Sequence, residues 1–140
     1  MVPNQNKLRV IKTVAEKNLV SIMNDTKWRE LQDAVINNLL FPPPYQAKYL
    51  LEDILHPEEF ESDVWYWGDW KEGIEPFYHV EWIRVRPKYL KHRGRLVSPE
   101  LIDITDDFIK LLKELSIPYQ LDDDTYYIYG YISDTSILTL

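Results

Sequence analysis

The sequence predicts a single α+β domain, in which helices pack on one face of an antiparallel β-sheet and an N-terminal helical extension precedes them. Three observations lead to this fold class. Apolar residues recur every three to four positions in residues 26–40 and 105–116, a spacing typical of helices. They alternate with polar residues in 77–86 and 125–131, as in strands. A chain of 140 residues has room for one core.

The first segment, residues 6–22, is predicted to form an amphipathic helix, because Leu8, Ile11 and Val14 fall at helical spacing with lysines between them. Asn24 to Thr26 then supply a second helix-start signal. We therefore divide the chain into a helical extension over 1–22 and an α+β domain over 23–140. The extension is expected to contribute little to the core, so a chain that starts at Met23 should fold.

The helix over 26–40 is expected to end at Phe41, because the prolines that follow cannot continue it. A short helix is predicted over 45–55, where Ala47, Leu50 and Ile54 have helical spacing. Thr105 is a candidate cap for the helix over 105–116. The sheet is predicted from four strands, and the basic residues 88–99 are expected to be turn-like. The predicted strands are 64–67, 77–86, 117–121 and 125–131.

Composition argues against several classes of active site. The chain has no cysteine, which removes disulfides, zinc–thiolate sites and thiol nucleophiles and fits the cytoplasm. Its three histidines lack ligand-like spacing, and it contains no nucleophile-elbow or HExxH motif. No apolar run reaches the length of about 20 residues that a membrane span needs. The sequence therefore predicts no catalytic residue, no metal ligand and no cofactor.

The net charge of −7 is unevenly distributed, because residues 84–95 hold six basic residues and no acidic one. The bulk field repels nucleic acid and anionic membranes, so an anion would have to bind at this basic stretch. Arginine suits bidentate binding of phosphate or carboxylate. One interpretation is therefore a small-anion site, and the other is that these side chains pair with neighbouring acids. The candidate anion-binding residues are Arg84, Arg86, Arg93 and Arg95.

An aromatic run at Trp65, Tyr66, Trp67 and Trp70 also has two interpretations. It could be a stacking platform for a ligand or a partner. Alternatively, strand alternation would put Trp65 and Trp67 in the core and leave Tyr66 and Trp70 at the rim. Carboxylates surround the run, and large aromatics beside carboxylates suit a basic partner. The predicted partner-binding residues are Tyr66, Asp69, Trp70 and Glu72.

Several motifs resemble those of an uncharacterised bacterial family of unknown function. They include Asn24-Asp25-Thr26-Lys27-Trp28, Gly94-Arg95-Leu96-Val97, Ile117-Pro118-Tyr119 and Ile128-Tyr129-Gly130-Tyr131. The resemblance covers roughly residues 23–131, and members of the family typically begin near the position of Met23. It implies no activity, cofactor or catalytic residue, although the members look like compact immunity-type proteins.

Two functional hypotheses follow. The first is a non-catalytic protein that binds another, basic, protein and in its most concrete form neutralises a toxin-like enzyme. The second is a protein or enzyme that uses the basic segment 84–95 on a phosphorylated or carboxylated small molecule.

Overall fold

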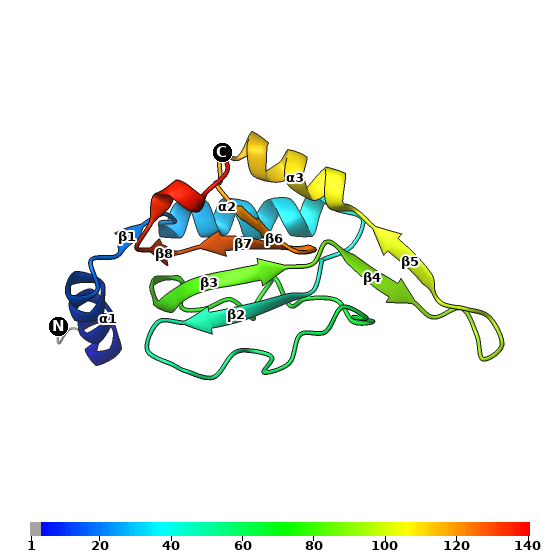
Figure 1. Cartoon of the computed structure of the whole chain (residues 1–140), viewed down its shortest axis with the longest axis horizontal. Coiled ribbons are helices and arrows are strands. Elements are labelled where there is room, and N and C mark those ends of the chain that lie inside the picture. The colour runs from blue at the N-terminus through cyan, green and yellow to red at the C-terminus, as the bar shows by residue number, and fades with distance from the viewer. Residues whose placement is uncertain (1–3) are drawn as a thin grey trace.

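A computed structural model of the chain describes residues 4–140 and shows the predicted α+β architecture (Figure 1). A four-stranded antiparallel sheet forms its centre, and two small two-stranded sheets flank it. The helices are α1 (Gln5–Glu16), α2 (Asp25–Asn38) and α3 (Thr105–Glu114), with short 3₁₀ turns η1 (Phe77–His79) and η2 (Thr135–Ile137). The strands are β1 (Val20–Ser21), β2 (Tyr45–Tyr49), β3 (Val80–Val85), β4 (Lys88–Lys91), β5 (Glu100–Asp103), β6 (Gln120–Asp122), β7 (Thr125–Tyr129) and β8 (Tyr131–Ile132).

The central sheet has the strand order β2-β3-β7-β6, and every neighbouring pair is antiparallel. Ile83 lies opposite Ala47 on one side and Ile128 on the other. Because directly opposed residues of antiparallel strands share a face, these three side chains point the same way. Both α2 and α3 cover that face. The buried cluster between the layers includes Trp28, Leu31, Val35, Val80, Ile83, Val85, Phe108, Leu111, Leu112, Tyr126 and Ile128.

The start of each covering helix is capped by a polar side chain. The Asn24 side chain accepts a hydrogen bond from the Lys27 N–H at 2.8 Å, so α2 begins where the sequence predicts. At α3 the capping group is Asp103 rather than Thr105. Its Oδ1 accepts from both the backbone N–H and the hydroxyl of Thr105, at 2.9 and 2.6 Å.

The connection over 50–76 lies partly against the opposite face of the sheet. Gln46 is only 2% exposed, and its amide donates to the Pro57 carbonyl at 2.8 Å. Its carbonyl oxygen accepts from Arg84 Nε at 2.8 Å. A buried amide needs partners for both of its ends, and the two bonds provide them. The first bond fastens the connection to β2, and the second links β2 to β3.

The helix predicted over 45–55 and the strand predicted over 64–67 were wrong, and the helix predicted over 6–22 ends at Glu16, before β1. Residues 45–55 do not form a helix: Tyr45–Tyr49 is the edge strand β2, and the apolar residues after it lie in a loop. Residues 64–67 are not a strand, because their backbone pairs with other loops and with β4. The Gly68 N–H donates to the Pro42 carbonyl at 3.1 Å, and the Val64 carbonyl accepts from the Leu90 N–H at 2.8 Å. The other three strands exist, over shorter ranges than predicted.

The basic residues 88–99 were expected to be turn-like, but they start with β4 and lead into its antiparallel partner β5. This hairpin extends away from the body of the molecule (Figure 1). The helix α1 lies at the opposite end, where the Asn4 amide donates to the Tyr78 hydroxyl at 3.2 Å.

The extension is mostly peripheral, because Leu8 and Ile11 are 47% and 58% exposed. Val10 is an exception at 2% exposed, and β1 pairs with β8. The first three residues of the predicted extension lie outside the described residues. Independent folding of 23–140 stays a prediction, which thermal melts of the two chain lengths test.

Candidate functional site

The four aromatic side chains of residues 65–70 are distributed differently from the expectation. Trp65 and Trp67 are 65% and 55% exposed, whereas Trp70 is 1% exposed. Trp70 packs edge-on against Tyr45, and its indole Nε1–H donates to the Pro43 carbonyl at 2.7 Å. The assignment of Trp65 and Trp67 to the core and of Trp70 to the rim was therefore wrong. Tyr66 is half-buried between the two exposed rings.

The exposed tryptophans are held in place by packing. The Trp67 ring stacks on Phe41 with centroids 6.4 Å apart and meets Tyr89 edge-on at 6.0 Å. Phe41 and Tyr89 also touch each other, at 4.5 Å. Trp65 is positioned by Tyr66, whose ring is perpendicular to it at 6.0 Å. Large rings fixed by packing lose little conformational entropy on binding, which suits them to anchor an interface.

A pocket of about 240 Å³ opens beside Trp67 at the outer edge of β2. The 50–76 connection pairs with the chain around β2 at two places, the bridge from Ala47 to His56 and the bond from Gly68 to Pro42. The pocket lies between these two places. Its lining consists of Tyr45, Ala47, His56, Pro57, Tyr66, Trp67, Gly68, Asp69 and Gly73. This pocket brings together two of the four predicted partner-binding residues, Tyr66 and Asp69.

Both glycines of the lining are required by close packing. A Cβ on Gly68 would collide with the Pro43 carbonyl, and one on Gly73 would collide with the Tyr45 hydroxyl. The Gly73 N–H closes the turn by donating to the Asp69 carbonyl at 3.1 Å, and the same carbonyl accepts from the Tyr45 hydroxyl at 2.6 Å. These bonds fix the backbone that carries Asp69 at the pocket mouth.

The two tyrosines that line the pocket remain neutral at ordinary pH. Burial raises the pKa of Tyr45, and the neighbouring Asp69 and Tyr49 raise it further. Burial also raises the pKa of Tyr66, against a smaller opposing effect of the Arg86 charge. Neutral rings keep the negative electrostatic face that attracts cations.

The chain segment that carries Trp67 is acidic. Residues 58–72 contain six carboxylates and one lysine. Asp69 and Glu72 are exposed, as expected, and their geometry is defined because Asp69 Oδ1 accepts from the Glu72 N–H at 3.0 Å. We refer to Trp65, Trp67, Asp69, Glu72 and the pocket as the acidic aromatic surface.

The four candidate anion-binding arginines do not converge. Arg86 is 4% exposed: its Nε donates to Asp124 Oδ2 at 3.3 Å, its Nη1 donates to the Glu61 carbonyl, and its guanidinium lies 4.4 Å from the Phe60 ring centroid. Arg84 Nε donates to the Gln46 side-chain carbonyl, and the Arg84 guanidinium lies 5.2 Å from the Phe60 ring centroid. Both are committed to internal contacts.

Asp124 completes the internal network around Arg86. Burial opposes its ionisation, yet the charges of Arg86 and Lys88 hold its pKa below the ordinary value. Arg93 and Arg95 lie instead on the exposed part of the hairpin, beyond β4, where Arg93 Nη2 donates to the Ser98 carbonyl at 2.8 Å. The basic run is thus divided between an internal network and a solvent-exposed loop.

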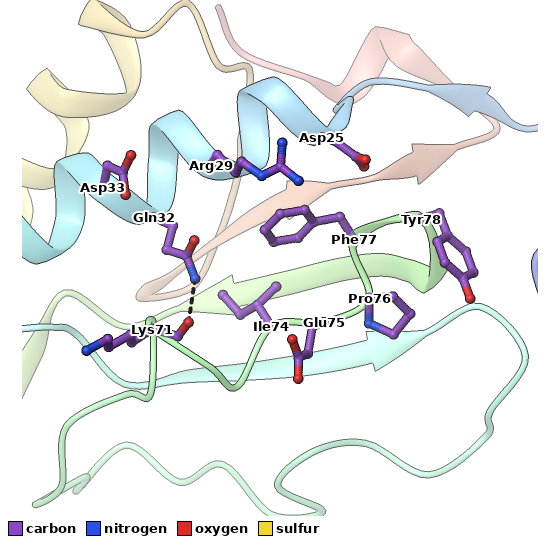
Figure 2. A pocket seen from close by; sticks show the side chains of 10 residues that line it. All are labelled: Asp25, Arg29, Gln32, Asp33, Lys71, Ile74, Glu75, Pro76, Phe77 and Tyr78. Carbon is purple, nitrogen blue, oxygen red and sulfur yellow. Dashed lines mark hydrogen bonds between the residues drawn. The ribbon is translucent and has the colours of Figure 1, made fainter.

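A second hollow of about 470 Å³ lies between α2 and residues 71–78 (Figure 2). Arg29 reaches over the Phe77 ring at 6.0 Å, and Gln32 Nε2 donates to the Lys71 carbonyl at 2.9 Å. Charges of both signs, from Asp25, Asp33, Glu75, Arg29 and Lys71, line this groove. It includes none of the sequence-predicted site residues, and its mixed charges favour no single class of ligand.

Sequence reasoning missed several residues that build the acidic aromatic surface. Phe41 and Tyr89 support Trp67, while Tyr45 and His56 line the pocket. Their contribution depends on contacts between distant segments, for which the local sequence gives no signal. No group of three or more His, Asp or Glu side chains within residues 4–140 is arranged to hold a metal ion.

The chain was compared with known protein families and structures. A family model described as a family of unknown function (DUF6678) matches residues 10–135. The chain belongs to this family. The DUF6678 match begins inside α1, ahead of the start near Met23 that the motifs suggested. No curated protein and no solved structure matches the chain. Among residues 4–140, no helix has both the length and the apolar character that crossing a bilayer requires.

Proposed function

We propose that this DUF6678 protein is a non-catalytic binding protein whose acidic aromatic surface docks onto another, basic, protein. The most concrete form of the proposal is an immunity-type protein that neutralises a toxin-like enzyme by covering a cationic region. A cysteine-free chain fits action in the cytoplasm.

The exposure of Trp65 and Trp67 is the observation that carries this proposal. Both rings are more than half exposed, although Trp70, only three residues beyond Trp67, is buried. Tryptophan is enriched among the residues that dominate interface energetics. Two fixed, exposed indoles beside a pocket therefore support a docking role.

The charge of the surrounding residues suggests the kind of partner. Six carboxylates against one lysine in residues 58–72 give a negative surface, and the whole chain carries −7. Complementary charge accelerates encounter and selects against partners of like charge. A basic protein is the partner that this surface suits.

A capture experiment with two baits tests the proposal. Wild type and the double variant Trp65→Ala/Trp67→Ala are immobilised, exposed to extract of the source cell, and the bound proteins are identified by mass spectrometry. We expect a basic protein on the wild-type bait and its loss from the double variant. The matched control is Ile11→Ala, since Ile11 is 58% exposed on α1, at the other end of the molecule from β4.

The control bait should retain the partner at the wild-type level. An identical set of proteins on all baits, or turnover of a substrate by the isolated protein, would overturn the proposal.

A further inference from the structure

We propose that the pocket beside Trp67 receives the cationic side chain of an arginine or lysine presented by the partner. This inference rests on the proposed function for its biological setting, but the pocket can be tested without any partner. It assigns to Tyr45, Tyr66, Trp67 and Asp69 a shared role as a receptor for a guanidinium or ammonium group.

Aromatic rings form the walls of the pocket. Trp67 and Tyr66 come from the 50–76 connection and Tyr45 comes from β2, and His56 and Pro57 also line the pocket. The faces of indole and phenol rings attract cations, indole most strongly. The Trp67 ring is kept in place by its contacts with Phe41 and Tyr89, so it is already positioned for a cation.

Asp69 provides the negative charge. It lines the pocket and is an exposed residue. Its Oδ1 accepts one hydrogen bond, from the Glu72 N–H, and within residues 4–140 its Oδ2 has no hydrogen-bonding partner. A carboxylate with one fixed and one available oxygen can accept an N–H donor from a guanidinium or ammonium group.

No lysine or arginine lines the pocket. Arg86, whose charge reaches Tyr66, points into the internal network and is bound by Asp124 and the Glu61 carbonyl. The His56 ring is paired with Glu52, at 2.9 Å from Nε2 to Oε1. The pocket therefore has a negative group at its mouth and no internal cation to fill it.

The pocket is also large enough for a long side chain. Its volume of about 240 Å³ exceeds that of one guanidinium group and leaves room for part of the aliphatic stem. The stem would lie against Ala47 and Pro57, and the charged end would meet Asp69. Long basic side chains commonly bury their stems on apolar surfaces in this way.

The test is a titration of the full-length protein followed by ¹H–¹⁵N NMR. The probes are N-acetyl-arginine amide and N-acetyl-lysine amide, each in the millimolar range. N-acetyl-citrulline amide serves as the uncharged isostere of arginine. We expect saturable shifts at His56, Gly68, Asp69 and Gly73 with either basic probe, and none with citrulline.

Two variants sharpen the titration. Asp69→Asn keeps the oxygen that accepts from the Glu72 N–H but removes the charge, and Trp67→Leu removes the ring. Each should lower the affinity for the basic probes by about fivefold or more. Ile11→Ala is the control, because Ile11 is 58% exposed on α1 and does not line the pocket, and the affinity of this variant for the basic probes should equal that of wild type.

Equal binding of citrulline would overturn the inference, because it would show a pocket that does not select charge. Shifts spread over all acidic residues, unchanged in Asp69→Asn, would also overturn it by showing unspecific attraction. Absence of any shift has the same consequence. The proposed function is tested separately by the capture experiment: a partner that depends on Trp65 and Trp67 can exist without a cation pocket, and the pocket can bind its probes although no partner is captured.

Discussion

The aromatic segment 64–70 and the basic segment 84–95 are each divided by the fold into an internal and an exposed part. In the first, Trp70 is buried while Trp67 is exposed. In the second, Arg86 is buried and bound, while Arg93 lies on the exposed hairpin loop. Residues of identical type, only a few positions apart, thus have opposite environments.

What separates them is whether a distant loop supplies a backbone acceptor. Trp70 donates to the Pro43 carbonyl, and Arg86 donates to the Glu61 carbonyl. Each buried polar group has found an acceptor in a distant loop, which removes the penalty for burying an unsatisfied donor. Trp67 packs on Phe41 and Tyr89 but is 55% exposed, and Arg93 donates to the nearby Ser98 carbonyl on the exposed hairpin loop.

The largest expected effect contrasts two tryptophans. Trp70→Ala should lower the free energy of unfolding by about 3–5 kcal/mol, because it empties a packed site and removes the donor to the Pro43 carbonyl. Trp65→Ala should change the free energy of unfolding by about 1 kcal/mol or less, because its ring is mostly exposed. Urea unfolding of both variants measures the contrast. Equal losses would show that the division within this segment is wrong.

The second contrast concerns two arginines. Arg86→Met should lower the free energy of unfolding by about 2 kcal/mol, since Asp124 and the Glu61 carbonyl each lose a charged donor. Arg93→Met removes only exposed bonds to Ser98 and should stay within about 0.5 kcal/mol of wild type. Urea unfolding curves of the two variants measure this difference. An Arg86→Met variant as stable as wild type would mean that the internal network contributes nothing to stability.

The sequence predicted those parts of the fold that local patterns control. The helix α2 followed from the start signals at Asn24 to Thr26 and from the apolar positions Trp28, Leu31 and Val35, which are all buried. The strands β3 and β7 followed from alternation, since Ile83 and Ile128 face the helices while Arg84 and Tyr127 face away. In these elements local preference and tertiary packing agree.

The errors occurred where long-range contacts override local patterns. In β2 both faces are covered, so Tyr45, Gln46 and Ala47 are all buried and no alternation shows. Apolar residues beyond the strand, such as Leu50, then completed a helical spacing by coincidence. Residues 64–67 have the composition of a strand, but they form none: the Val64 carbonyl accepts from the Leu90 N–H of β4, and the N–H of Gly68, which follows them, donates to the Pro42 carbonyl. The candidate partner-binding residues included Trp70, which is buried and donates to the Pro43 carbonyl, whereas Trp65 and Trp67 of the same segment are exposed.

The third contrast, between two histidines, predicts a dependence of stability on pH. His79 is 7% exposed, and its Nε2 accepts from the Leu51 N–H at 3.2 Å. Burial lowers its pKa, aided by the charges of Lys48 and Arg9 and opposed by Glu52. In the unfolded chain His79 binds a proton near pH 6.5, whereas in the folded chain it binds a proton only at a lower pH. The stability present above about pH 6.5 should therefore decline as the pH falls below that value.

Unfolding curves collected from pH 7.5 downward check this contrast. His79→Gln should flatten the decline, whereas His92→Gln should leave it unchanged, because His92 is exposed beyond β4. A decline that is the same in His79→Gln and wild type would assign the effect to other groups.

A smaller effect is expected on the kinetics of partner binding. Asp69→Lys should slow association with the captured basic partner by about threefold at low ionic strength, and by less as salt screens the charge. Stopped-flow or surface-based association rates measure this. A rate that does not change at any salt concentration would remove Asp69 from the steering surface.

The dissociation constant of the captured partner for Trp67→Ala, relative to wild type, tests the central claim most directly. We expect about 30-fold weaker binding or more, as for an interface anchor, with an unfolding midpoint close to that of wild type because the ring is 55% exposed. Unchanged affinity in this folded variant would contradict the assignment of the acidic aromatic surface as the docking site.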